Sequence, residues 1–506
     1  MGILLFADDA VGLDEDIIGV QEFCDSVNTW CVQNEMKVGI TKCGILEIPP
    51  LVGGQGDMED PILTEAHPAR DALRIMGELV PIVKEYEYLG LVLNRNIRQV
   101  EQQLAKQRRE KGWKCLMAMT PFLSGSSFPI AMRIQVVKSV LIPVLLYGAE
   151  IFGMNRSVSD PLQSIVNKAV RKILGLKTGW RKASGHALNR EMGLLPMSAY
   201  TNGRKARGYA KAWTLKTYVH DVVTNTLHPG NKGNHPWSYK TRNWVDRTVT
   251  NNEWTVDRDN WTAGWYNDPS LPPARVKRVV EQATRRREET IQGNNRARFD
   301  IYVEHLYGQY PLWTVGVGYL PKYTVGLQWI VRFRVGAVLL AHEHKVMRLH
   351  ERAGCPWCHS QGNESLDHLV FECGGFSDLR RGRISILLAE VEELPQGHPA
   401  TEDGGPELPQ CANHRLSWLL GSSVEGRFLQ NWGVTVPEGT PDQPTHNEEV
   451  HPEDHELTGA MPPYLIVGEY LSSLMRLRTR MIGDHVQGLP PENEVDRIAM
   501  DQRPNG

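Results

Sequence analysis

Two groups of residues in this sequence have types and spacing that suit metal chemistry. Near the start, Asp8 and Asp9 stand between two apolar runs, residues 3–6 and 10–13. This pattern predicts a strand, a tight turn and a second strand, with both carboxylates at the turn. Buried unpaired carboxylates are costly, whereas Mg²⁺ is held by one or two of them. The alternative is an ordinary acidic turn, because Asp is a common turn residue.

The second group is a set of three cysteines and a histidine. Two residues separate the first pair of cysteines, and the later histidine and cysteine follow within the next fifteen positions: Cys355, Cys358, His368 and Cys373. The close pair can chelate from one turn, and the later pair completes a tetrahedral Cys₃His set that leaves no open position. We therefore expect a structural zinc ion. His359 is a rival ligand but a poorer one, because it directly follows Cys358, and chance buried cysteines are the alternative.

The order of motifs around the acidic pair resembles that of reverse transcriptases from LINE-like (non-LTR) retrotransposons. Residues 6–9, Phe-Ala-Asp-Asp, resemble the acidic box of that family, and residues 25–30 resemble the helix after it. Residues 36–44 resemble the block that carries a lysine beside the incoming nucleotide. Residues 85–91 resemble the "YLG" hairpin that grips the primer end, and residues 142–150 resemble a segment downstream of it. The cysteine cluster is similar to the zinc knuckle of these elements.

The resemblance implies RNA-directed DNA polymerisation by two-metal nucleotidyl transfer, with an RNA template and a DNA primer or target as partners. It implies that Asp8 and Asp9 bind magnesium and that Lys42 neutralises the departing pyrophosphate. Three residues would place the primer end: Tyr88, Leu89 and Gly90. Without the resemblance, Lys42 would be interpreted as an ordinary solvent-exposed lysine. The hairpin that contains Tyr88, Leu89 and Gly90 would then be interpreted as part of a hydrophobic core. The family usually has Asn where this chain has Gly39, which weakens the match of that loop.

The acidic box lies close to the first residue of the chain. A two-metal site needs a third carboxylate from an earlier palm strand, and the family places its template grip upstream of the box. We therefore expect an N-terminally truncated reverse-transcriptase domain that does not polymerise alone. The alternatives are a non-catalytic nucleic-acid-binding relic that uses the basic thumb and zinc knuckle, and a decayed reading frame.

Charge is distributed unevenly along the chain. Residues 101–220 hold 20 Lys and Arg against five acids, a net charge of +15, whereas the whole chain carries −3. Such asymmetry predicts a face that binds a polyanion. Apolar residues between 162 and 174 recur at helical spacing, and nearby cations lie off that apolar face. We assign five of these cations to nucleic-acid binding, with a solvated helix face as the alternative: Lys168, Arg171, Lys172, Arg181 and Lys182.

These patterns predict an α+β fold: a partial palm of β-hairpins and one helix, then a mainly helical thumb and connector, then a small zinc knuckle. The expected domains are a partial palm over 1–96, a basic helical thumb over 97–220 and a connector rich in Trp and cations over 221–323. A helix over 327–350 leads into the knuckle within 324–376, and an acidic, Pro-rich linker and C-terminal helix fill 377–506. For the tryptophans we favour packing over stacking on bases.

Composition excludes several classes of protein. Hydrophobic residues make up 41% and charged residues 23% of the chain, and no apolar run approaches the roughly 18 residues of a membrane span. No signal peptide is recognisable. Eight cysteines are too few for a disulfide framework in a chain of 506 residues, which suits a reducing compartment. We expect an intracellular protein, and the family resemblance implies nuclear action.

Overall fold

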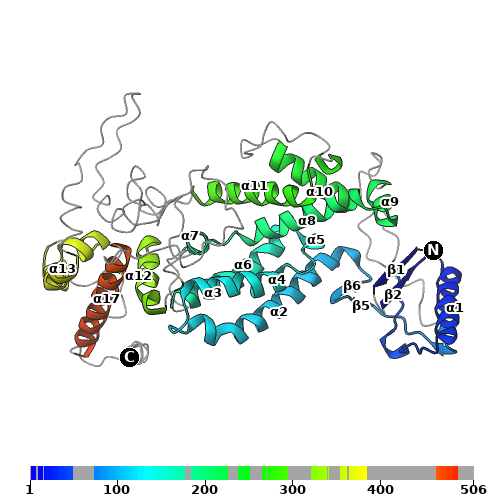
Figure 1. Cartoon of the computed structure of the whole chain (residues 1–506), viewed down its shortest axis with the longest axis horizontal. Coiled ribbons are helices and arrows are strands. Elements are labelled where there is room, and N and C mark those ends of the chain that lie inside the picture. The colour runs from blue at the N-terminus through cyan, green and yellow to red at the C-terminus, as the bar shows by residue number, and fades with distance from the viewer. Residues whose placement is uncertain are drawn as a thin grey trace, which may run out of the picture. The chain divides into compact units, whose positions relative to one another are not determined.

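The structure is a computed structural model of the 506-residue chain. It describes residues 2–6, 9–14, 16–48, 73–176, 184–225, 237–250, 265–268, 271–293, 319, 321–338, 340, 354–361, 364–384 and 463–487. Within these residues the chain is mainly helical, with three small antiparallel sheets of two strands each (Figure 1). None of the described helices is long and apolar enough to cross a lipid bilayer.

The acidic box forms the predicted hairpin. Strand β1 (Gly2–Phe6) pairs with β2 (Asp9–Leu13), and Phe6 faces Asp9 next to the turn. Helix α1 (Ile17–Gln33) follows, and its first turn is capped because the Asp16 carboxylate accepts a hydrogen bond from the Gly19 N–H at 2.8 Å. The two strands and the helix that the sequence indicates at this end are therefore present; Asp9 is the first residue of β2, and Asp8 lies outside the described residues.

Two further hairpins follow a short 3₁₀ turn at Ile40–Lys42. They are β3 (Arg74–Ile75) with β4 (Glu78–Leu79), and β5 (Glu85–Tyr88) with β6 (Leu91–Asn94). Cys24 of α1 packs with Ile75 and Val80 in a small core. The described strands are separate hairpins and form no continuous palm sheet, so the structure shows a helical protein with small sheets.

The chain divides into two compact units, and each is described by itself. Unit 1 comprises residues 1–111, 145–162 and 197–284, and unit 2 comprises residues 112–144, 163–196 and 285–506. Helices α2 (Ile97–Ser124) and α6 (Arg156–Ile173) each continue from one unit into the other. The domain limits expected from the sequence remain a prediction.

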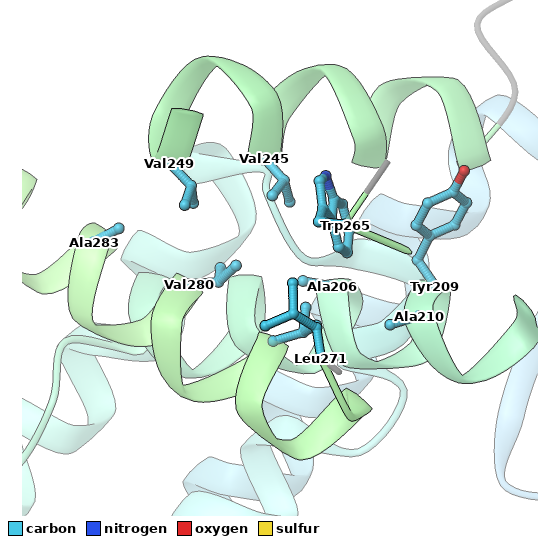
Figure 2. Close-up of a cluster of buried hydrophobic side chains, with 10 residues drawn as sticks. Ala206, Tyr209, Ala210, Val245, Val249, Trp265, Leu271, Val280 and Ala283 are labelled. Carbon is cyan, nitrogen blue, oxygen red and sulfur yellow. The ribbon is translucent and has the colours of Figure 1, made fainter. Parts of the chain in front are cut away.

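Unit 1 contains a core built around Trp265. Four helices carry it: α8 (Met197–Thr214), α9 (Tyr218–Asn225), α10 (Trp237–Val245) and α11 (Pro273–Gly293). Figure 2 shows Trp265 beside Val245, with Ala206 of α8 and Val280 of α11 below them. Its indole N–H donates to Asp246 at 2.9 Å. Trp237 and Trp244 pack against the same core, as expected, whereas Trp254 and Trp261 lie outside the described residues.

A buried carboxyl on α11 makes the stability of unit 1 depend on pH. Burial raises the pKa of Glu281 from 4.5 to about 7, and Lys277 at 3.5 Å only partly opposes this. The folded state therefore keeps a proton that the unfolded chain releases near pH 4.5. Its stabilising contribution is complete below pH 4.5 and is lost as the pH rises through 7.

Replacing Glu281 by glutamine should remove this dependence. The unfolding free energy of the wild type relative to Glu281→Gln should fall by about 2–3 kcal/mol between pH 5 and pH 8. Urea denaturation at both pH values measures it. Glu110→Gln, at an exposed position of α2, is the matched control and should show a constant difference. A constant difference for Glu281→Gln as well would contradict the assignment.

Unit 2 is built on the apolar face of α6. The predicted face is confirmed, because all of its seven positions are buried: Leu162, Ile165, Val166, Ala169, Val170, Ile173 and Leu174. Helix α3 (Ile130–Val136), the π-helical turn Val137–Leu141, α4 (Ile142–Leu146) and α7 (Gly185–Glu191) add to it. From the C-terminal half come α12 (Thr324–Arg334), α13 (Ser377–Arg383) and α17 (Pro463–Gln487).

Helix α12 is shorter than the helix expected over 327–350. It ends at Arg334, and Gly336 takes a left-handed φ of 64° there. The Ala337 N–H then donates to the Arg332 carbonyl at 2.7 Å, which closes the helix end. The sequence indicated no break because Gly336 is the only helix-ending signal in an apolar run. Residues 341–350 lie outside the described part of the chain.

Helix α12 is attached to the rest of unit 2 at the C-terminal end of α6. The Ile173 carbonyl accepts from Gln328 at 2.5 Å and from Arg133 at 3.2 Å, and the Leu174 carbonyl accepts from Arg332 at 2.8 Å. Cations at a helix C-terminus are favoured by the helix dipole. One of the two cations, Arg133, belongs to the basic excess counted over residues 101–220.

Candidate functional site

The four predicted zinc ligands come together in unit 2. Their ligand atoms all lie within 4.8 Å of one another. The Cys355 and Cys373 sulfurs are 3.8 Å apart, and the Cys358 sulfur is 3.4 Å from His368 Nε2. Among the described residues, no other set of Cys, His, Asp or Glu side chains has the spacing of a metal site. His359 is not part of the cluster. The set could bind a metal such as zinc.

The environment of the ligands fits a bound cation. His368 Nδ1 lies 3.7 Å from a Glu372 carboxylate oxygen, which orients the ring so that Nε2 faces the sulfurs. Burial opposes ionisation of Cys358, but hydrogen bonds with Ser360, the Gly374 N–H and His368 outweigh it and lower its pKa to about 6. A thiolate is the form that ligates a metal, whereas burial raises the pKa values of the other two cysteines, whose ionisation would require the cation itself. With four protein ligands and no open position, the site is structural in type.

Local backbone geometry positions the ligands. Gly354 adopts a φ of 83°, and any Cβ there would collide with the Ser360 carbonyl oxygen. The turn is closed where the Cys355 N–H donates to that same carbonyl at 3.0 Å. His368 begins a π-helical turn, His368–Glu372, and Cys373 directly follows it. Arg380 of α13 donates to the Cys373 carbonyl at 2.5 Å.

Helix α17 closes over the zinc module, which we define as residues 354–384. Arg478 donates to both carboxylate oxygens of Glu364, at 2.9 and 2.7 Å, and both side chains are buried. Its guanidinium also lies 5.7 Å from the centre of the Trp357 ring, and the Trp357 indole N–H donates to Glu364. Tyr470 donates to the Val370 carbonyl at 2.7 Å. One side of α17 is therefore fixed to the cluster.

The other side of α17 packs on α12 (Figure 1). The helices cross at Gly326 and Gly468, where a Cβ on Gly326 would meet the backbone carbon of Gly468 at 2.9 Å. Further along α12, Arg334 forms a buried ion pair with Glu191 at 2.9 Å. The metal cluster, α17, α12 and α7 thus form one continuous set of contacts within unit 2.

The residues assigned to magnesium and catalysis are only partly within the described structure. Asp8 lies outside it, and Asp9 is exposed. Lys42 is also exposed, and its carbonyl accepts from the Tyr86 hydroxyl at 2.6 Å. Burial is the main cause that raises the pKa of Tyr86, followed by the charges of Cys43 and Asp9. Tyr86 therefore feels the charge of Asp9 and contacts the lysine block. Among the described residues, Asp9 belongs to no group of side chains with metal-site spacing.

The "YLG" hairpin has a tight turn, and side chains from later in the chain donate hydrogen bonds to its carbonyls. Leu89 and Gly90 take φ values of 49° and 74°, which is the turn geometry that suits a two-residue hairpin loop. The Leu89 carbonyl accepts from the Tyr147 hydroxyl, and the Gly90 carbonyl accepts from Arg108 at 2.7 Å. The Arg108 guanidinium lies 4.9 Å from the centre of the Tyr147 ring. Half-buried Tyr88 ends β5 beside this turn.

Arg108 and Tyr147 are site residues that sequence reasoning missed. Tyr147 was within a motif already assigned to the family, and its contact with Leu89 spans 58 positions. Arg108 was counted only as one cation in a basic run. The donors lie far along the chain from the Leu89–Gly90 turn, so no local sequence pattern indicates that they bind it.

The thumb cations divide into exposed and buried groups. Lys168 is exposed on α6, with its ammonium 4.1 Å from the centre of the Trp113 ring, and Lys172 is half-buried one turn later. Burial lowers the pKa of Arg171, which is also half-buried. Arg181 and Lys182 lie outside the described residues. Arg133, by contrast, is fully buried against the Leu123 and Ile173 carbonyls, and burial lowers its pKa to about 10.

Acids are nearly absent from the segments that surround these cations. Residues 112–144 and 163–196 contain ten Lys and Arg and one acid. That acid is Glu191, which is buried and paired with Arg334. We define the thumb surface by three described cations of these segments: Lys114 and Lys168, which are exposed, and Lys172, which is half-buried. No carboxylate of the two segments competes for those charges.

No protein-family model matches this chain, and no curated protein matches it.

Proposed function

We propose that the chain carries the palm-hairpin, thumb and zinc-knuckle portions of a non-LTR retrotransposon reverse transcriptase, and that its thumb surface binds nucleic acid. The observation that carries the proposal is the ten-to-one excess of cations over acids in residues 112–144 and 163–196. A nucleic-acid backbone is the polyanion that such a surface fits, because each neutralised phosphate releases counterions. Zinc in the Cys₃His cluster would support the fold of the same unit.

The order of motifs supports the family assignment. The acidic box and the "YLG" block both form hairpins, and the latter's turn is held by Tyr147, a residue of the downstream motif. In the proposed enzyme, Asp8 and Asp9 would bind Mg²⁺, and Lys42 would meet the leaving pyrophosphate. Tyr88, Leu89 and Gly90 would place the primer end.

Salt dependence of binding tests the nucleic-acid proposal. Affinity for an RNA template annealed to a DNA primer should fall steeply with salt, as measured by fluorescence anisotropy. Lys168→Gln together with Lys172→Gln should weaken binding and reduce the slope of log K against log salt by about 1.5–2. Lys84→Gln, at an exposed position of unit 1, should change neither. Binding that ignores salt, or equal slopes for all variants, would contradict the proposal.

A second function, nucleic-acid binding without catalysis, is favoured by one observation. Asp9 is exposed and belongs to no group with metal-site spacing among the described residues. Primer extension with Mg²⁺ separates the two functions. Products that Asp8→Ala and Asp9→Ala abolish would establish the polymerase, and binding without products would establish the binding protein.

A further inference from the structure

A large aromatic side chain lies exposed among the cations of the thumb surface. Trp113 on α2 is 41% exposed, and the Lys168 ammonium lies 4.1 Å from the centre of its ring. Lys114 is exposed at the next position, and Met117, one turn later, is 54% exposed. Tryptophan commonly buries most of its surface, so an indole that remains 41% exposed beside the Lys168 ammonium is a candidate binding feature.

The chemistry of this position differs from that of a plain basic patch. Ammonium groups attract phosphates whether the strand is paired or not. An accessible indole adds a flat apolar face, and a duplex offers it nothing because its bases are already stacked on one another. An unpaired base can stack on the ring, and every base has such a face. Residues 112–144 contain no acid, and the exposed carboxylate of Glu110 lies one turn before Trp113 on α2.

We propose that Trp113 is a stacking platform for an unpaired nucleobase, and that Lys168 and Lys114 hold the phosphates of the same strand. The thumb surface would then prefer single-stranded over duplex nucleic acid. This inference rests on the proposed function, because it names the form of nucleic acid that the thumb surface takes. The competing explanation is that Lys168 and Trp113 only pack together at the surface.

Strands with and without bases distinguish these explanations. The probes are an oligouridylate of about 15 nucleotides, an abasic strand of equal length and a duplex of equal length. The wild type should bind the oligouridylate about tenfold more tightly than the abasic strand. Trp113→Ala should remove that preference and leave affinity for the abasic strand unchanged. Trp113→Tyr, which keeps an aromatic face, should restore most of it.

Trp30 provides the matched control. It is 54% exposed on α1, and among the described residues no cation lies over its ring. Trp30→Ala should therefore bind all three probes like the wild type, and circular dichroism should show that every variant is folded.

The inference and the proposed function fail in different ways. Salt-dependent binding that is equal for the oligouridylate and the abasic strand, or that Trp113→Ala leaves unchanged, would overturn the stacking platform while the basic surface stands. Binding to none of the three probes would overturn the proposed function itself.

Discussion

Replacing Cys373 by serine should abolish stoichiometric zinc binding and destabilise unit 2. Cys373 is fully buried, its sulfur lies 3.8 Å from that of Cys355, and no other described side chain is placed to substitute for it. Metal-binding free energy becomes folding free energy in small zinc modules, so the loss of one of four ligands removes most of it. Purified wild type should contain about one zinc per chain, and Cys373→Ser close to none.

Two measurements check this prediction. Metal content by mass spectrometry gives the stoichiometry, and thermal unfolding with and without a chelator gives the stability. Cys115→Ser is the control, because Cys115 is a half-buried cysteine of α2 outside the cluster. It should keep its zinc and its melting temperature within a few degrees of the wild type. A wild type without zinc, or equal metal content in both variants, would contradict the assignment.

The metal cluster could be predicted from the sequence because its ligands are local. Two turns supply all four ligands, and the chain between the first and last is short enough that spacing alone restricts their geometry. What holds the turns together could not be predicted. Glu364 and Arg478 are separated by 114 positions, and nothing near either residue indicates the other.

Charge counting indicates a basic region of the chain, but it does not indicate which of its cations reach solvent. Arg133 and Lys205 belong to the basic segment, yet both are buried, Arg133 against helix-end carbonyls and Lys205 against Glu101 and the Ile151 carbonyl. Their role is structural, and only burial reveals it. A periodic pattern separates an apolar face from a polar one, but it does not distinguish a cation that caps a helix from one that meets solvent.

The hairpins were predictable and their assembly was not. Apolar residues on both sides of a turn indicate two strands, and both β1–β2 and β5–β6 form where the sequence indicates a hairpin. Which hairpins pair with one another depends on contacts between distant residues, and among the described strands each pairs only within its own hairpin. The expectation of a palm was made from the family resemblance, and the hairpins alone neither require nor exclude it.

Breaking the buried ion pair between α17 and the zinc module is expected to have the second large effect. Arg478→Met would leave the Glu364 carboxylate buried without its guanidinium, although Trp357 would still donate to it. Removing one partner of a buried pair costs about 3–5 kcal/mol, because the remaining charge is uncompensated. We expect that loss in the free energy of unfolding measured by urea denaturation, together with faster proteolysis of α17.

A double variant and a matched control make this result specific to the pair. Glu364→Gln combined with Arg478→Met removes both charges and should recover part of the loss, because the carboxylate no longer stays buried and unpaired. Arg476 is exposed on α17, two residues before Arg478. Arg476→Met should therefore change the free energy of unfolding by no more than about 0.5 kcal/mol. Equal effects of Arg476→Met and Arg478→Met would show that α17 is not fixed to the zinc module through Glu364. A larger loss for Arg478→Met, accompanied by weaker zinc retention, would show that the C-terminal helix and the metal cluster stabilise one another.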